Sequence, residues 1–194
     1  MSNPEDLGIT IVDRSGQKSQ TPFVVWFTGL SGAGKSTIAN LLEAKLHAQG
    51  QHTYLLDGDK IRSGLNRDIG FSAEDRAESV RRTAEVASLM LEAGLIVVVA
   101  LISPFEADRV AAKKIIGEER FYEIYVSTPL DIAEKRDTKG LYKKARLGLL
   151  KNFTGIDSPY EVPLAPALTV FTQQQSAQAC ALAVFNFLLQ KPLA

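Results

Sequence analysis

Short apolar runs alternate with longer amphipathic segments along most of this 194-residue chain. The runs are too short for core helices and are rich in β-branched and aromatic residues, which favours strands. Strands separated by helices predict a parallel sheet that is covered by helices on both faces. Five strands are predicted in this way, at residues 23–28, 52–56, 95–101, 121–126 and 167–171.

Amphipathic periodicity predicts three main helices between and after these strands. The longest opens on the capping-box pattern Ser72-Ala73-Glu74-Asp75 and ends before Gly94. Its apolar face is expected to carry Val80, Ala84, Ala87 and Leu91. The three helices are predicted at about residues 35–49, 73–93 and 174–190.

The first twenty residues lack this periodicity. They are polar and contain the breaks Asn3-Pro4 and Ser15-Gly16, so we expect a loose leader at residues 1–20. The remaining residues, 21–194, are enough for one α/β domain with a substantial core and too few for two.

A glycine-rich segment directly follows the first predicted strand. Residues 29–36 read Gly-Leu-Ser-Gly-Ala-Gly-Lys-Ser, which matches the phosphate-binding P-loop G-x-x-x-x-G-K-[ST] in its strand, loop and helix setting. The glycines let the backbone turn its N–H groups inward around a phosphate, and the following helix adds the positive end of its dipole. Lys35 is expected to reach the β- and γ-phosphates of a nucleotide, and the Ser36 hydroxyl to bind Mg²⁺. A glycine-rich turn with an incidental lysine is the alternative, which the flanking strand and helix disfavour.

This motif indicates both the fold class and the kind of ligand. We predict a P-loop NTPase-type three-layer α/β/α fold with a mostly parallel five-stranded sheet, and a nucleoside triphosphate as the ligand. Ligands of such folds bind at the carboxyl ends of the strands. The expected nucleotide-binding residues are Gly29, Leu30, Ser31, Gly32, Ala33, Gly34, Lys35, Ser36 and Thr37.

Two aspartates close the second predicted strand, at the same edge of the sheet as the P-loop. Phosphoryl transfer needs an acidic group near Mg²⁺ and a group that orients or deprotonates the attacking hydroxyl. Asp57 and Asp59 are suited to divide these tasks, with Asp57 at the metal and Asp59 at the hydroxyl. An Asx turn that caps a helix is the structural alternative, and the neighbouring P-loop favours the catalytic interpretation.

Arginines follow these aspartates closely. Arg62, Arg67 and Arg76 surround Phe71, and guanidinium groups suit phosphate and sulfate oxyanions whereas a phenylalanine face suits a purine. We expect Arg62 and Arg76 to flank an acceptor cleft and Arg81 to lie on a solvated helix face.

The segment at 135–151 is strongly basic. It contains one acidic residue, Asp137. Its seven basic residues are Lys135, Arg136, Lys139, Lys143, Lys144, Arg146 and Lys151. A basic lid that shields the transferred group from water is one interpretation, with Gly140 and Gly148 as hinges. A basic surface helix is the other, and the charge alone favours it. An RNA-contacting patch is disfavoured, because few aromatic residues are interleaved.

Composition narrows the function classes. The chain carries 22 Lys and Arg residues and 22 Asp and Glu residues, which argues against a general nucleic-acid binder. Cys180 is the only cysteine, so no internal disulfide is possible and a reducing compartment is expected. No apolar stretch reaches the roughly 20 residues of a membrane span, and the N-terminus lacks a signal-peptide pattern. A cytoplasmic protein without a membrane partner is therefore expected.

Two loops are ambiguous on their own. Ser103, which follows the third predicted strand, is either a turn residue or a cleft residue. The loop at 153–161 contains glycine, proline and two aromatic residues, and Phe153 is either its buried anchor or part of a site.

Taken together, these segments resemble the adenylylsulfate kinase family. The match extends from about Trp26 to Pro166, and no sulfurylase domain accompanies it, so the stand-alone kinase form is expected. The P-loop is generic, whereas the later segments are close to diagnostic as a set. These segments are Leu56-Asp57-Gly58-Asp59 with Arg62, Gly64-Leu65-Asn66, Gly70-Phe71-Ser72 with Asp75-Arg76, Ile102-Ser103-Pro104, Lys139-Gly140-Leu141-Tyr142-Lys143-Lys144 and the loop at 153–161.

The resemblance implies an ATP- and Mg²⁺-dependent kinase, usually a homodimer, that phosphorylates the 3′-hydroxyl of adenosine 5′-phosphosulfate (APS). The product would be 3′-phosphoadenosine 5′-phosphosulfate (PAPS), which serves sulfate assimilation. Phe71 and Phe153 would sandwich the adenine, and residues 139–151 would form the lid. The catalytic residues would be Lys35, Asp59 and Ser103, and the metal would lie at Ser36 and Asp57. The implied APS-binding residues are Asp59, Arg62, Phe71, Arg76, Ser79, Ile102, Ser103, Lys139, Phe153 and Gly155.

Some features depart from the family or stay open. Ser79 stands where an APS-contacting asparagine is usual, so one hydrogen bond there is expected to be shortened or lost. Thr138 and Ala133 replace a more usual proline and cysteine without disturbing the expected chemistry. A phosphoserine intermediate is recorded for the family at the position of Ser103, but in-line transfer from ATP needs none. The alternatives are a kinase for another small hydroxyl compound and a catalytically silent nucleotide-binding module.

Overall fold

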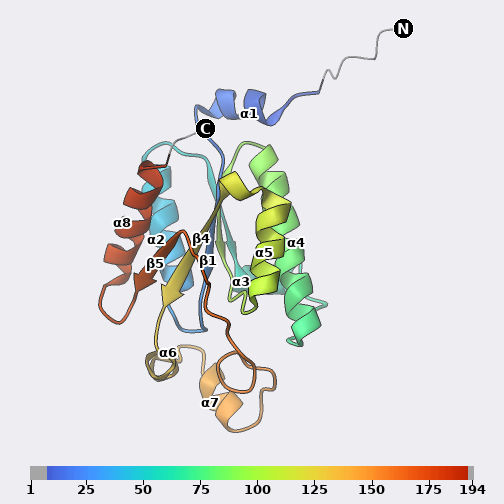
Figure 1. Cartoon of the computed structure of the whole chain (residues 1–194), viewed down its shortest axis with the longest axis vertical. Helices are drawn as coiled ribbons and strands as arrows, with labels where there is room; N and C mark the ends of the chain where they lie inside the picture. The colour runs from blue at the N-terminus through green and yellow to red at the C-terminus, as the bar shows by residue number, and fades with distance from the viewer. Residues whose placement is uncertain (1–7, 192–194) are drawn as a thin grey trace.

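Five parallel strands form the central sheet of the structure, a computed structural model that describes residues 8–191 (Figure 1). The strand order is β2-β3-β1-β4-β5. The P-loop-type fold and the predicted parallel sheet are confirmed, and every strand pairing is parallel. The strands are β1 (Val24–Thr28), β2 (Thr53–Asp57), β3 (Ile96–Ala100), β4 (Phe121–Ser127) and β5 (Leu168–Phe171).

Helices cover both faces of this sheet because alternate residues of its central strands point to opposite sides. In β1, Val25 and Phe27 pack on one side against α2 (Lys35–Ala48) and α8 (Ala177–Leu189). Val24 and Trp26 pack on the other side with α4 (Ala73–Glu92) and α5 (Glu106–Ile116). Figure 1 shows the two pairs of helices flanking the sheet.

The three predicted helices are confirmed with small changes in their bounds. The longest, α4 (Ala73–Glu92), has its capping box: Asp75 N donates to Ser72 Oγ at 3.1 Å, and Ser72 N donates to Asp75 Oδ2 at 3.1 Å. All four residues expected on its apolar face are buried. Local patterning was therefore sufficient to place this helix.

Several shorter helical elements were not among the three main helices predicted from the sequence. Most have few residues or a high proportion of charged ones, so their periodicity is weak. They are α3 (Gly58–Ser63), α5 (Glu106–Ile116), the 3₁₀ turn Glu118–Arg120, α6 (Leu130–Arg136) and α7 (Leu141–Arg146).

The prediction of a loose leader at residues 1–20 is wrong in its second half. Residues 11–18 form a helix, α1 (Ile11–Lys18), whose capping box is closed by Thr10. Residues 1–7 lie outside the described residues. The Gln20 side chain connects the segment after α1 to the domain. Its Nε2 donates a hydrogen bond to Gly94 O at 2.7 Å, and its Oε1 accepts one from His52 N. The bounds of the domain itself remain a prediction.

The ends of the sheet differ in what they carry. Figure 1 shows α1 at one end, whereas α6 and α7 lie at the other, toward which the arrows of β4 and β5 point. None of the helices found in residues 8–191 has the length and apolar character needed to cross a membrane.

Candidate nucleotide and acceptor site

A cleft of about 800 Å³ lies at the carboxyl ends of the strands. It brings together segments that are far apart in the sequence: the P-loop, the ends of β2 and β3, the first turns of α4 and the segment that connects α6 to α7. The predicted site residues that line it are Ser31, Gly32, Ala33, Gly34, Lys35, Ser36, Thr37, Asp57, Asp59, Arg62, Phe71, Arg76, Ser79, Ile102, Ser103, Lys139 and Phe153.

The P-loop backbone explains its glycines. Gly29 has φ +147°, and a Cβ at this position would lie 2.7 Å from Val126 O. Gly32 has φ +72°, and its Cβ would lie 2.9 Å from Ala133 O. Both positions therefore require glycine, for conformation and for close approach to the neighbouring backbone.

Gly29 and Leu30 do not line the cleft. Instead, their carbonyl oxygens accept hydrogen bonds from Lys35 Nζ, at 2.9 and 2.8 Å. These two residues hold the lysine, and the residues from Ser31 onward face the ligand space.

Lys35 is buried, and its burial lowers the pKa of its ammonium group from 10.5 to about 7. Asp57 and Asp59 oppose this shift, and Lys139 reinforces it. The lowered pKa means that the site favours negative charge next to Lys35, because an anion would restore the charged form of the lysine.

The two carboxylate oxygens of Asp57 have different surroundings. Its Oδ1 accepts a hydrogen bond from Asp59 N at 3.0 Å and caps α3, as the Asx-turn alternative predicts. Its Oδ2 is buried and has no hydrogen-bond partner within residues 8–191. One oxygen of this carboxylate therefore remains available at the cleft.

Asp59 and Lys139 form an ion pair across the cleft. Both side chains are more than half exposed, so the pair contributes little to stability. The pair joins α3 to the segment before α7, and it occupies the carboxylate that was expected to face the acceptor hydroxyl.

Two guanidinium groups gather around Phe71, as the sequence suggested. Arg62 lies over the ring at 4.2 Å from its centroid and Arg76 at 5.8 Å. Burial lowers the pKa of both arginines, and for Arg76 the charge of Arg62 adds to this effect. Arg76 is anchored further by a hydrogen bond to Asn152 O at 2.7 Å. Two like charges held this close favour an anionic ligand between them.

The two residues expected from the loop at 153–161 behave differently. Phe153 lines the cleft and packs edge-on against Tyr142, with 4.9 Å between the ring centroids. Gly155 does not line it, so its role in acceptor binding stays a prediction. It has φ +93°, and a Cβ there would lie 3.1 Å from Leu130 and 3.2 Å from Leu30, on the outer side of the loop. Glycine is required here by backbone conformation and packing.

Ser79 and Ser103 are both buried at the cleft wall. Ser79 Oγ accepts a hydrogen bond from Asn66 Nδ2 at 2.8 Å, so its own proton is not used in that bond. Ser103 Oγ accepts a hydrogen bond from Trp26 Nε1 at 2.9 Å. Sequence reasoning identified the two serines and missed these partners, which come from distant positions in the chain.

The basic segment 135–151 is only partly directed at the cleft. Of its seven basic residues, only Arg136 and Lys139 line it. Arg136 bonds to the P-loop carbonyls of Gly32 and Ala33 and to Thr172 O, and Tyr142 OH donates to Ser31 O at 2.9 Å. The segment is therefore tied to the P-loop through residues to which sequence reasoning assigned no individual role.

Known proteins with similar sequences agree with one another in the family that they indicate. The family model described as Adenylylsulphate kinase matches residues 21–171. The adenylyl-sulfate kinase of Pseudomonas aeruginosa is 52% identical over 189 residues, which cover 96% of this chain and 96% of that protein. The bifunctional enzyme NodQ of Azospirillum brasilense is 53% identical over 190 residues, and the chain spans 31% of its length.

A solved structure agrees with these sequence matches. The APS kinase CysC of Mycobacterium tuberculosis, determined in complex with AMPPNP and APS, superimposes with a TM-score of 0.85 at 46% identity. The superposition covers 88% of this chain and 99% of that one.

Proposed function

Because the chain belongs to the adenylylsulphate kinase family, we propose that it transfers the γ-phosphoryl group of ATP to the 3′-hydroxyl of APS. The product would be PAPS, formed in sulfate assimilation. One observation carries the proposal: the P-loop lysine and the Asp59, Arg62 and Phe71 cluster line the same cleft. A nucleotide and an anionic purine acceptor would therefore meet in one cleft.

The P-loop half provides the nucleotide site. The backbone N–H groups from residue 31 onward would bind the phosphates, and Lys35 would follow the γ-phosphate as charge develops on its oxygens. On binding, Lys35 would exchange its bonds to the Gly29 and Leu30 carbonyls for bonds to phosphate. The buried position of this lysine strengthens its interaction with the transferred group.

The residues at the start of α2 and the end of β2 fit Mg²⁺. Ser36 presents an exposed hydroxyl, and Asp57 Oδ2 is an acceptor without a hydrogen-bond partner in the described part of the chain. In residues 8–191 no group of three or more His, Cys, Asp or Glu side chains has metal-site geometry, so water and phosphate oxygens would complete the shell. When bound, Mg²⁺ would neutralise phosphate charge.

The acceptor half would bind APS through charge and stacking. Asp59 would orient or deprotonate the 3′-hydroxyl, Arg62 and Arg76 would hold the anionic groups, and the adenine would lie between Phe71 and Phe153. Entry of APS would replace two contacts of the free protein, the ion pair of Asp59 with Lys139 and the stacking of Arg62 on Phe71.

Ser103 would shape this half of the cleft. Its hydroxyl is buried and accepts a hydrogen bond from the Trp26 indole, so it is not poised as a nucleophile. Direct in-line transfer from ATP to the acceptor, without a phosphoserine, is the mechanism that this arrangement supports.

The proposal is tested by turnover of ATP with APS, with PAPS detected by chromatography and adenosine 5′-monophosphate as the control acceptor. We expect PAPS from APS and no comparable product from the control. Phosphorylation of a different hydroxyl compound, or binding of ATP without any transfer, would contradict the proposal.

We also propose that the active form is a cytoplasmic homodimer, which rests on the resemblance to the family. Light scattering coupled to gel filtration should give twice the 21.1 kDa mass of the chain. A monomer or a larger assembly would contradict it.

A further inference from the structure

One buried cation lies behind the acceptor half of the cleft and has no place in the chemistry described above. Arg109, on α5, is 1% exposed and does not line the cleft. Burial of a guanidinium group is costly unless partners compensate its charge. Its contacts should therefore explain why it is there.

Two of these contacts neutralise the charge. Arg109 NH2 pairs with Glu106, and its Nε lies 2.7 Å from Glu123 Oε1. The third contact is of another kind, because NH1 donates to the backbone carbonyl of Ser103 at 2.8 Å. That carbonyl belongs to the wall of the acceptor cleft.

Ser103 adopts a backbone conformation that needs such support. Its φ is +44°, a left-handed conformation that is unfavourable for a residue with a side chain. Trp26 holds its Oγ, and the Thr28 hydroxyl lies 3.3 Å from its carbonyl oxygen. Arg109 adds the shorter, charge-assisted bond to the same oxygen.

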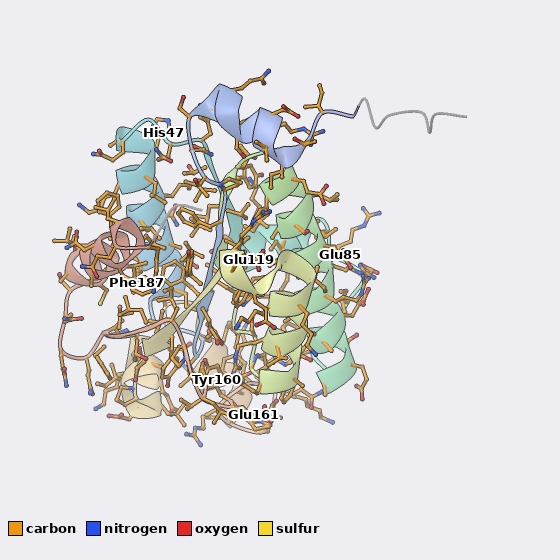
Figure 2. The ribbon with its side chains drawn as sticks, turned by 45° about the horizontal axis from the view of Figure 1, so that its top comes forward. His47, Glu85, Glu119, Tyr160, Glu161 and Phe187 are labelled. Atoms are coloured by element: carbon orange, nitrogen blue, oxygen red, sulfur yellow. The ribbon has the colours of Figure 1, made fainter. Side chains whose placement is uncertain are left out.

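The loop at 153–161, whose Phe153 lines the cleft, meets the same guanidinium group through Tyr160. The ring centroid of Tyr160 lies 6.0 Å from the Arg109 guanidinium, and its hydroxyl forms a hydrogen bond with the Thr28 hydroxyl at 2.9 Å. Glu161 N donates to Pro104 O at 2.8 Å, and Glu161 Oε2 accepts from Glu106 N at 2.6 Å. Figure 2 shows Tyr160 and Glu161 together beside the lower end of α5.

We propose that Arg109 is a positioning residue for the acceptor: it holds the turn at 102–104 and the loop at 153–161 in the geometry that binds APS. The inference rests on the proposed function. A guanidinium group suits this role because its planar fork serves two carboxylates, a carbonyl and a ring at once, which a lysine ammonium cannot do. Within residues 8–191, no hydrogen bond or ion pair joins Arg109 to the P-loop residues 29–37. We therefore expect ATP binding to be unaffected by substitution of Arg109.

The test compares Arg109→Met and Arg109→Lys with wild type by steady-state kinetics in APS and in ATP. Loss of a charge-assisted bond that supports the site should raise KM for APS about ten- to hundredfold in Arg109→Met. KM for ATP should change less than about twofold. Arg109→Lys should recover part of the APS affinity, because a charged donor to Ser103 is retained.

The matched control is Glu123→Gln, which weakens the same buried ion pair without touching the bond to Ser103. It should lower the thermal unfolding midpoint as the Arg109 variants do and leave KM for APS unchanged. If Arg109→Met does not fold, Arg109→Lys alone decides, by its ratio of KM for APS to KM for ATP.

A merely structural role would give a different result. Unchanged KM for APS in the Arg109 variants, with unfolding midpoints lowered as in Glu123→Gln, would overturn the inference. Equal increases in both KM values would also overturn it. Absence of PAPS formation by the wild-type protein would instead overturn the proposed function, and with it the premise of this inference.

Discussion

The two halves of the cleft are built on different principles. The nucleotide half is contiguous, occupies residues 29–37 and depends mainly on backbone conformation, as the positive φ of Gly29 and Gly32 shows. The acceptor half is assembled from side chains of five separate segments, which contain Asp59, Phe71, Ser103, Lys139 and Phe153.

The two halves differ in the contacts that must be broken when a ligand binds. The backbone N–H groups of the P-loop are oriented by the fold itself. In the acceptor half, the charged groups already have partners within the protein: Asp59 pairs with Lys139, Arg62 stacks on Phe71, and Arg76 donates to Asn152 O. Changes in the first half should therefore abolish nucleotide use, whereas changes in the second should alter selectivity for the acceptor.

The largest effect is expected from Lys35→Met, which removes the only buried charge of the nucleotide half. Loss of a positioned charge at the transferred group should reduce kcat by about 10³-fold. Lys114→Met, at an exposed position on α5, is the matched control and should keep wild-type turnover. The measurement is the initial rate of PAPS formation, with circular dichroism as a check on folding. A kcat within about threefold of wild type in Lys35→Met would contradict the assignment.

The next largest effect is expected from substitution of Gly29. Comparison with Gly50 separates the effect of a steric clash with a neighbouring backbone from the effect of an unfavourable positive φ. Gly29→Ala should destabilise the protein by about 2–4 kcal/mol and abolish ATP binding, because its Cβ would lie 2.7 Å from Val126 O. Gly50→Ala has a positive φ as well but nothing within 4 Å, so about 1 kcal/mol and normal ATP binding are expected. Urea unfolding and calorimetric titration with AMPPNP measure the two quantities. Equal effects in both variants would show that steric contact with Val126 is unimportant.

A smaller and more selective effect is expected in the acceptor half. Phe71→Ala should raise KM for APS about tenfold through lost stacking and leave KM for ATP unchanged. Phe171→Ala is the matched control, because Phe171 is 43% exposed against 42% for Phe71 and does not line the cleft. Steady-state kinetics, with APS and ATP varied in turn, measure the two KM values. If both KM values rise in Phe71→Ala, the two halves do not act separately.

The smallest effect concerns pH. Because the pKa of Lys35 in the free protein is about 7, an anion that needs the charged lysine should bind with uptake of a proton above that pH. Half of the lysine is charged at pH 7 and about one-eleventh at pH 8, so ATP affinity should fall about fivefold over this unit. Below pH 6 the affinity should level off.

Calorimetry in buffers of different ionisation enthalpy measures the proton uptake directly. Lys35→Arg, which stays charged, should lose the uptake. Identical proton uptake in wild type and Lys35→Arg would show that the titrating group is another one.

Local signals predicted the scaffold well and located the P-loop between β1 and α2. Strand β1, the P-loop and α4 depend on contiguous patterns, such as the capping box at Ser72 and the buried face of α4. Helix α1 was missed because it is short and mostly polar and buries no residue, although the capping box of Thr10 and Asp13 is a local signal.

The acceptor half was predictable only in part. Resemblance pointed to Phe71, Ser103 and Phe153, which line the cleft, and to Gly155, which does not line it and lies close to Leu30 and Leu130 instead. Arg109 carried no signal at all, because its role depends on the meeting of α5, β4 and a distant loop in three dimensions. Long-range convergence of this kind leaves no local pattern in the sequence.

The central claim is that the acceptor oxygen attacking the γ-phosphate is the 3′-hydroxyl of APS. Parallel turnover of ATP with APS and with the 3′-deoxy analogue of APS tests it most directly. The account predicts phosphorylation of APS and none of the analogue, although the analogue should compete with APS for the cleft. Phosphorylation of both compounds would place the reacting hydroxyl elsewhere on the acceptor and contradict the account.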